Sequence, residues 1–95
     1  MYLICNFTFI QIFIEVEGTC GITNEGIKAL AKLPKLEKLE LFNLDISDEV
    51  LKYFIELKSL YLYGISTLSD AALYHIGNYT ELRHLEIICN YLFNF

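Results

Sequence analysis

The chain has 95 residues, of which 55% are hydrophobic and 15% aromatic, and its formal net charge at pH 7 is −5. This length allows one domain, and the apolar content excludes an intrinsically disordered chain. The acidic balance argues against a nucleic-acid binder, because phosphate recognition needs clustered Lys and Arg. The one local group of basic residues, Lys32, Lys35 and Lys38, is expected to lie on a solvated edge.

An apolar stretch runs from Met1 to Ile14. It is shorter than the roughly 20 residues of a membrane helix, and it runs directly into Glu15, so no membrane span is expected. Because Met1 to Gly18 contains no Lys or Arg, the stretch also lacks the basic region of a signal peptide. We therefore expect an intracellular protein, in the cytoplasm or the nucleus.

The three cysteines, Cys5, Cys20 and Cys89, are widely spaced along the chain. No close Cys or His pair has the spacing of a zinc site or a disulfide framework, so we expect reduced thiols and neither a metal nor a cofactor. Asn6 and Asn78 each begin a glycosylation pattern, which matters only in a secretory compartment. We interpret both as chance matches.

The most informative feature is an alternating leucine motif that recurs along the chain. It predicts a short strand that points alternate side chains to one face. Its three full copies are Leu36, Leu39 and Leu41, then Leu57, Leu60 and Leu62, then Leu82, Leu85 and Ile87. A weaker copy consists of Ile14 and Val16.

The first three of these four copies along the chain are each followed by a hydroxyl residue and a helical pattern. The hydroxyls suit the capping of helix amides, and acidic residues beside them suit the positive end of the helix dipole. The expected caps are Thr23, Ser47 and Ser69, and the acidic residues are Asp48, Glu49 and Asp70. Apolar pairs three residues apart predict the buried helix faces: Ile27 and Leu30, Leu51 and Phe54, Leu73 and Ile76.

The motif Leu-x-x-Leu-x-Leu, then Ile/Leu-Ser/Thr-Asp/Asn-x-x-Leu and a short helix, resembles the cysteine-containing leucine-rich repeats of F-box substrate receptors and antagonist-of-mitotic-exit-network proteins. The resemblance covers roughly Ile14 to Ile88. It implies an α/β leucine-rich-repeat solenoid, a short horseshoe segment with parallel strands on the concave face and short helices on the convex face. Residues 1–95 would form a single domain, with repeat units at approximately 10–34, 35–56, 57–81 and, in part, 82–95.

The chain departs from the family pattern in three ways. The characteristic cysteine after the strand has one rough counterpart, Cys20, and no F-box precedes the repeats. The spacing between successive strands is 25, 21 and 25 residues, so the middle unit is four residues short. Three of the four are missing between Phe54 and Leu57, which predicts a second helix that ends abruptly at about Phe54, or a unit that packs differently.

Both ends of the chain are apolar, whereas solenoids normally finish with a polar outer face. Two explanations are open at this point. The chain is a truncated piece of a longer protein, or it is a short protein that associates with itself through its uncapped ends.

Outward residues of the expected strands should line the concave face and form columns across it. One column would contain Glu15, Glu40, Tyr61 and Glu86, and the next would contain Glu17, Phe42, Tyr63 and Ile88. These residues without Glu17, together with Lys38 and His84, form our candidate partner-binding set. Carboxylates beside exposed aromatic rings favour a protein or peptide with basic and apolar side chains. The alternative is that the charges only keep the sheet soluble, with Phe42 and Tyr63 covered by missing sequence.

No catalytic residues are expected, and the chain is not expected to be an enzyme. His84 and Cys89 lie five residues apart, but His84 should face outward while Cys89 falls in a loop. We expect a protein-binding module that resembles the substrate-recognition repeats of F-box proteins in ubiquitin-dependent degradation by SCF-type ligases. The alternatives are a structural or assembly factor without a ligase connection, for example in mitochondria, a secreted recognition protein, or a truncated fragment without function.

Overall fold

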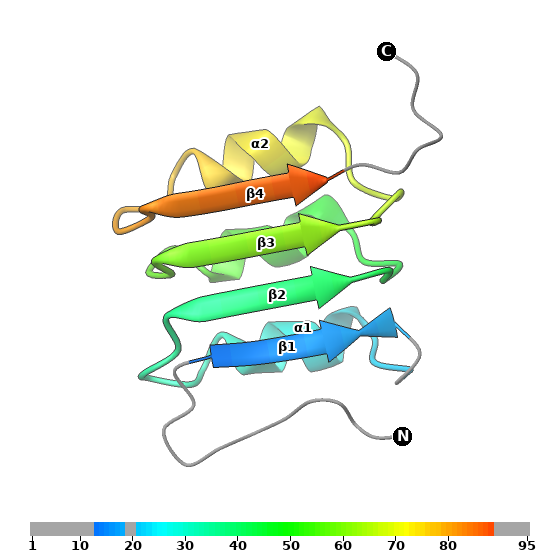
Figure 1. The fold of residues 1–95 in the computed structure, drawn as a ribbon, viewed down its shortest axis with the longest axis horizontal. Helices are drawn as coiled ribbons and strands as arrows, with labels where there is room; N and C mark the ends of the chain where they lie inside the picture. The colour runs from blue at the N-terminus through cyan, green and yellow to red at the C-terminus, as the bar shows by residue number, and fades with distance from the viewer. Residues whose placement is uncertain (1–12, 19–20, 89–95) are drawn as a thin grey trace.

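The computed structural model describes residues 13–18 and 21–88 of the 95-residue chain. Strands and helices alternate along it (Figure 1): β1 (Phe13–Glu17), α1 (Asn24–Leu30), β2 (Lys38–Phe42), the 3₁₀ helix η2 (Asp48–Tyr53), β3 (Ser59–Tyr63), α2 (Asp70–Ile76) and β4 (His84–Ile88). The expected α/β class is confirmed. The expectations that concern Cys5, Cys20, Cys89, Asn6 and the apolar ends lie outside the described residues.

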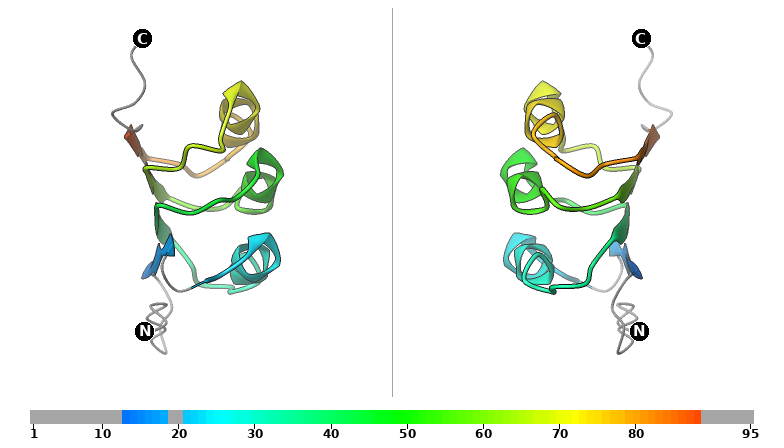
Figure 2. Two further views of the ribbon diagram at one scale, coloured as in Figure 1. Left: turned by 90° about the vertical axis from the view of Figure 1, so that its right-hand side faces the viewer. Right: turned by 90° about the vertical axis from the view of Figure 1, so that its left-hand side faces the viewer.

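The four strands form one parallel sheet in the order β1-β2-β3-β4, and the helices all lie on one side of it (Figure 2). The register pairs Ile14 with Leu39, Leu39 with Leu60, and Leu60 with Leu85. The leucine motifs therefore align across the sheet as the sequence predicts. Within the described part of the chain, no helix is long and apolar enough to cross a membrane.

The core lies between the sheet and the helices. Inward side chains of the first three strands are almost completely buried, and Ile27 of α1 and Leu51 of η2 pack against them with no exposed surface. Alternate residues of a strand face the same side, so a strand with apolar residues at every second position buries all of them at once. Each such Leu or Ile contributes about 1.5 to 3 kcal/mol of transfer free energy.

Two of the three expected helix caps are present. The Thr23 hydroxyl accepts a hydrogen bond from the Gly26 amide at 3.4 Å, and the Ser69 hydroxyl accepts one from the Ala71 amide at 3.2 Å. The prediction for Ser47 is wrong, because its side chain makes no capping bond. The Val50 amide, which a capping hydroxyl would engage, donates instead to the Ser47 carbonyl at 3.2 Å, in the tighter i to i+3 pattern of a 3₁₀ helix.

The middle helix ends at Tyr53, with Phe54 as its C-cap, which confirms the abrupt end that the short spacing predicts. Six residues of 3₁₀ helix at about 2.0 Å each span roughly 12 Å, while the seven residues of α1 at 1.5 Å each span roughly 10.5 Å. The tighter winding therefore covers the same length of sheet with fewer residues.

Polar side chains at the helix starts join neighbouring strand–helix segments. The Ser47 amide donates to Oδ1 of Asn24 at 3.0 Å. The Ser69 amide and hydroxyl donate to the two carboxylate oxygens of Asp48 at 2.8 and 2.7 Å. The acidic residue of the motif thus holds the cap residue of the next segment, in addition to any effect on its own helix dipole.

The sequence predicted that Leu73 and Ile76 form the buried face of α2 (Asp70–Ile76), and this prediction is wrong for Leu73. Ile76 is buried, but Leu73 is 54% exposed, and Ala72 is buried in its place. Leu73 stands at the position of Leu51, which is completely buried because α2 lies beside η2. Among the described residues no helix lies on the far side of α2, so nothing covers Leu73 in the same way (Figure 1).

Candidate binding face

The face of the sheet opposite the helices carries all nine residues of the candidate binding set. We call it the open sheet face and define it by the outward residues of the four strands: Phe13, Glu15, Glu17, Lys38, Glu40, Phe42, Ser59, Tyr61, Tyr63, His84, Glu86 and Ile88. The sequence predicted these outward positions from the alternation with the buried residues.

The pairing register produces the expected columns. Glu15, Glu40, Tyr61 and Glu86 are successive register partners across the sheet. The neighbouring column begins at Glu17 and continues through Phe42, Tyr63 and Ile88. The candidate residues, which lie up to 73 positions apart in the chain, therefore share one continuous surface.

Aromatic rings stack along the middle of this face. The Phe42 and Tyr63 ring centroids are 4.8 Å apart with an interplanar angle of 16°. Tyr61 lies 6.1 Å from Tyr63, and the His84 ring lies 5.0 Å from Tyr61 on its other side. Neighbouring strands of a sheet lie about 4.8 Å apart, so aromatic residues in register are placed at stacking distance by the backbone.

Lys38 lies among these rings. Its Nζ is 4.8 Å from the Phe13 ring centroid and 5.1 Å from that of Tyr61, and it lies 3.5 Å from the Glu40 carboxylate. The Glu40 side chain is only 18% exposed. Lys38 therefore neutralises the carboxylate nearest the centre of the face, a consequence that the column pattern did not reveal. Phe13 is the register partner of Lys38, and although its alternation predicts an outward residue, it is not in the candidate set.

Tyr63 is tied to the last strand. Its hydroxyl donates to Oε1 of Glu86 at 3.1 Å. Desolvation of the phenol, followed by the hydrogen bond to Glu86 and the charges of Glu86 and Glu40, raises the pKa of Tyr63 to about 12. The phenol is therefore a stable donor at neutral pH, and it holds the Glu86 side chain against the aromatic rows.

These contacts divide the face into two parts. Glu40 and Glu86 are engaged by Lys38 and Tyr63, whereas Glu15 and Glu17 make no ion pair or side-chain hydrogen bond within residues 13–18 and 21–88. At the other edge, Ile88 is 48% exposed. The open sheet face thus runs from an acidic edge at β1, over stacked rings, to a mixed edge at β4, where Ile88 lies beside Glu86 and His84.

Residues that the sequence offered for metal binding or catalysis can be located in the described part of the chain. There, no three His, Cys, Asp or Glu side chains gather as metal ligands. His84 lies on the open sheet face and stacks on Tyr61, and Cys89, the nucleophile considered beside it, is outside the described residues. Asp48 and Glu49, the neighbouring carboxylates, bond to Ser69 and Lys52 respectively.

Comparisons of the chain with protein-family models, with curated proteins and with solved structures found no match.

Proposed function

We propose that the chain is a leucine-rich-repeat module that binds a protein or peptide on the open sheet face. Support comes from the aligned leucine motifs, from the helix that follows each of the first three strands, and from the position of all helices on one side of the sheet. In such a solenoid the strand face is the concave, partner-binding surface. The observation that carries the proposal is the row of stacked rings on this face beside carboxylates: Phe42, Tyr63 and Tyr61, which are half-buried, and His84, which is exposed.

The favoured partner is an extended peptide with basic and apolar side chains. Its basic groups would lie over Glu15 and Glu17, and its apolar groups over the rings of Tyr61 and Tyr63 and over Ile88. Aromatic side chains contribute large contact areas at low entropic cost and dominate binding energy in desolvated patches. The charged edge would mainly set the association rate and the orientation of the peptide.

By resemblance, the binding would serve substrate recognition in ubiquitin-dependent degradation, as in F-box proteins. Sequencing of the transcript through both ends of the reading frame tests this link. A reading frame that continues into an F-box supports it. A frame that continues into a basic targeting leader favours an assembly factor, for example in mitochondria.

An array of immobilised peptides that combine Lys or Arg with Leu or Phe tests the binding itself. We expect Tyr63→Ala to lower the affinity by about tenfold or more, because truncation of an aromatic hot-spot residue costs about 2 kcal/mol or more. Tyr74→Ala is the matched control, since Tyr74 is 72% exposed on α2 and outside the proposed surface.

Charge reversal examines the acidic part of the proposal. Glu40→Lys and Glu15→Lys should both weaken binding of basic peptides, and Glu25→Lys, on the first turn of α1, should leave it unchanged. If Glu40→Lys and Glu15→Lys bind the selected peptides as the parent chain does, the basic-peptide hypothesis is wrong.

A second candidate function is assembly with a second copy of the chain. The inward residues Leu85 and Ile87 of β4 remain 40% and 39% exposed, and β4 is an edge strand of the described sheet. Pairing of two β4 edges would extend the sheet and cover these side chains. Sedimentation velocity tests this role: Ile87→Glu should abolish a dimer, whereas Ile55→Glu, at a similarly exposed site on another edge, should not. A parent chain that sediments as a monomer at high concentration contradicts it.

A further inference from the structure

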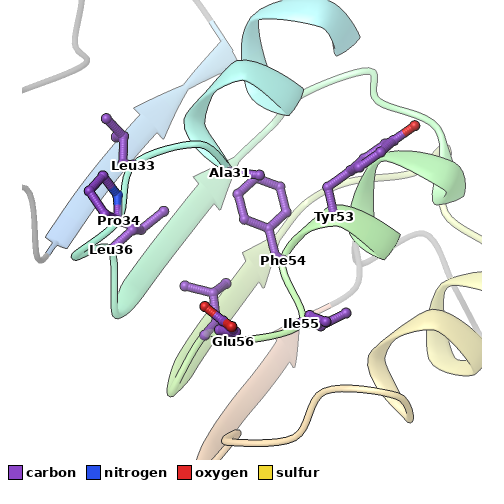
Figure 3. Close-up of a pocket in the computed structure, with 9 residues that line it drawn as sticks. Ala31, Leu33, Pro34, Leu36, Tyr53, Phe54, Ile55 and Glu56 are labelled. Atoms are coloured by element: carbon purple, nitrogen blue, oxygen red, sulfur yellow. The ribbon is translucent and has the colours of Figure 1, made fainter.

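A pocket of about 90 Å³ opens where α1 and η2 end, at the edge of the molecule from which β2 and β3 start (Figure 3). Ala31, Leu33 and Leu36 line one side, and Phe54 and Leu57 line the other. None of the lining residues belongs to the open sheet face. The pocket is therefore a separate site, independent of the function proposed above.

The pocket coincides with the shortest connection in the chain. Five residues separate Leu30 from Leu36, and five separate Ile76 from Leu82, but only Ile55 and Glu56 separate Phe54 from Leu57. The third residue of each long connection, Leu33 and Tyr79, packs against the core. The middle segment has no residue at this position, so the space remains unfilled.

The contact made by Tyr79 shows where the missing side chain would lie. Its ring is buried, and its hydroxyl donates to the carbonyl of Leu51 at 2.6 Å, so Tyr79 leans onto the preceding strand–helix segment. A side chain at the equivalent place after Phe54 would lean onto segment β1–α1. Ala31 and Leu33, which line the pocket, lie in the connection that directly follows α1.

The size of the pocket favours a small branched side chain. Its volume of about 90 Å³ is smaller than the roughly 150 Å³ cavities that accept benzene. Tyr53 and Ile55 stand at the rim and are 39% and 42% exposed, which leaves apolar surface around the opening. Among the described residues that line the pocket, Glu56 alone carries a formal charge.

We propose that this pocket receives a leucine side chain of a partner protein, with a basic group beside the leucine facing Glu56. The leucine occupies the place that Leu33 and Tyr79 fill in the other two segments. We include a basic group because the negatively charged Glu56 lines the pocket. The chain then has two docking surfaces, one on the open sheet face and one at this edge.

The probe for this site is 3-methylbutylamine, which joins the leucine side chain to an ammonium group. Titrated into the full ¹⁵N-labelled chain at constant ionic strength, it should cause saturable shifts at the amides of Ala31, Phe54 and Leu57. The neutral analogue 3-methylbutanol should bind about two- to fivefold more weakly, as expected for loss of an exposed ion pair. Glu56→Gln should remove this difference between the two probes.

Substitution of a lining residue by a larger side chain fills the pocket and tests whether the probe binds there. Ala31→Leu should weaken the probe by roughly tenfold or more, because the new side chain takes its place. Ala31→Met is a second filling variant, since the flexible Met side chain adapts to an irregular space and keeps the fold intact. Ala29→Leu is the matched control on the exposed side of α1, and it should bind as the parent chain does. Absence of saturable shifts in the parent chain, or unchanged binding in both filled variants, overturns the proposal.

Discussion

The two edges of the sheet carry the same residue pattern but bury it very differently. Ile14 and Val16 of β1 are completely buried, whereas their register counterparts in β4, Leu85 and Ile87, are 40% and 39% exposed. The difference follows from the order of the elements. A helix follows β1, β2 and β3, but among the described residues none follows β4. The inward face of a strand is therefore closed mainly by the helix that comes after it, more than by the neighbouring strand.

The largest expected effect compares two residues of one column across the sheet. Ile14→Ala should lower the free energy of unfolding by about 2 to 5 kcal/mol, because it removes a completely buried side chain and leaves a cavity. Leu85→Ala should cost about 1 kcal/mol or less, since much of the lost surface is already in contact with water. Urea denaturation followed by circular dichroism measures both. Equal losses would show that β4 is covered in solution, by a second copy or by another segment.

The sequence was sufficient to predict the strands, the register and the outward columns. Each of these depends on alternation with a period of two residues, which is strong at Leu39, Leu41, Leu60 and Leu62. The same pattern predicted Leu85 to be inward, which is correct for its direction, but it carries no information on what covers the strand. Burial at an edge depends on the neighbouring element, and that is a tertiary property.

The local sequence pattern also could not predict the contacts between neighbouring strand–helix segments. Asp48 suggested helix-dipole stabilisation, yet its two oxygens accept bonds from Ser69, 21 residues further along. Ser47 suggested a cap, but the 3₁₀ winding of η2 engages the Val50 amide through the backbone. In the candidate binding face, the sequence placed Lys38 and Glu40 correctly as outward residues, but it did not show that they pair with each other.

Tyr79 provides the next test, because its hydroxyl links the connection after α2 to η2. Tyr79→Phe removes the buried hydrogen bond to the Leu51 carbonyl and should destabilise the chain by about 1 to 1.5 kcal/mol. Tyr74→Phe is the control, because the Tyr74 side chain is 72% exposed. Thermal unfolding of both variants measures how much this hydrogen bond contributes to stability. Similar melting temperatures for Tyr79→Phe and the parent chain would show that the bond between Tyr79 and the Leu51 carbonyl does not stabilise the packing of α2 on η2.

Burial also raises the pKa of Tyr79 above its ordinary value of about 10. The folded chain therefore retains the phenol proton more strongly than the unfolded chain does. The stability that this difference provides is complete below about pH 10, and it is lost as the pH rises from there toward the pKa of the folded state. Tyr79→Phe should remove this part of the alkaline loss of stability.

The next comparison is between Asp48 and Asp70, which occupy the same motif position in two successive segments, and the expected difference in stability is smaller. Asp48→Ala removes both bonds to Ser69 and should cost roughly 0.5 to 1 kcal/mol, since the bonds are exposed to solvent. Asp70 occupies the same motif position one segment later, and within the described part of the chain its side chain accepts no hydrogen bond. Asp70→Ala should therefore change the urea midpoint little. A larger loss of stability for Asp70→Ala than for Asp48→Ala would contradict the conclusion that the Asp48–Ser69 hydrogen bonds stabilise the contact between neighbouring segments.

The smallest effect concerns protonation on the open sheet face, where β3 meets the uncovered strand. Tyr63 should titrate at about pH 12, followed through its ring ¹³C resonance. Glu86→Gln removes the negative charge of the carboxylate that accepts the hydrogen bond from the Tyr63 hydroxyl. The pKa of Tyr63 should therefore move down toward 10. Glu81→Gln is the control, because Glu81 precedes β4 and lies outside the open sheet face. An unchanged pKa in Glu86→Gln would show that Tyr63 and Glu86 are not held together in solution. No side-chain hydrogen bond would then tie β4 to the aromatic centre of the open sheet face, and the proposed peptide-binding surface would end at β3.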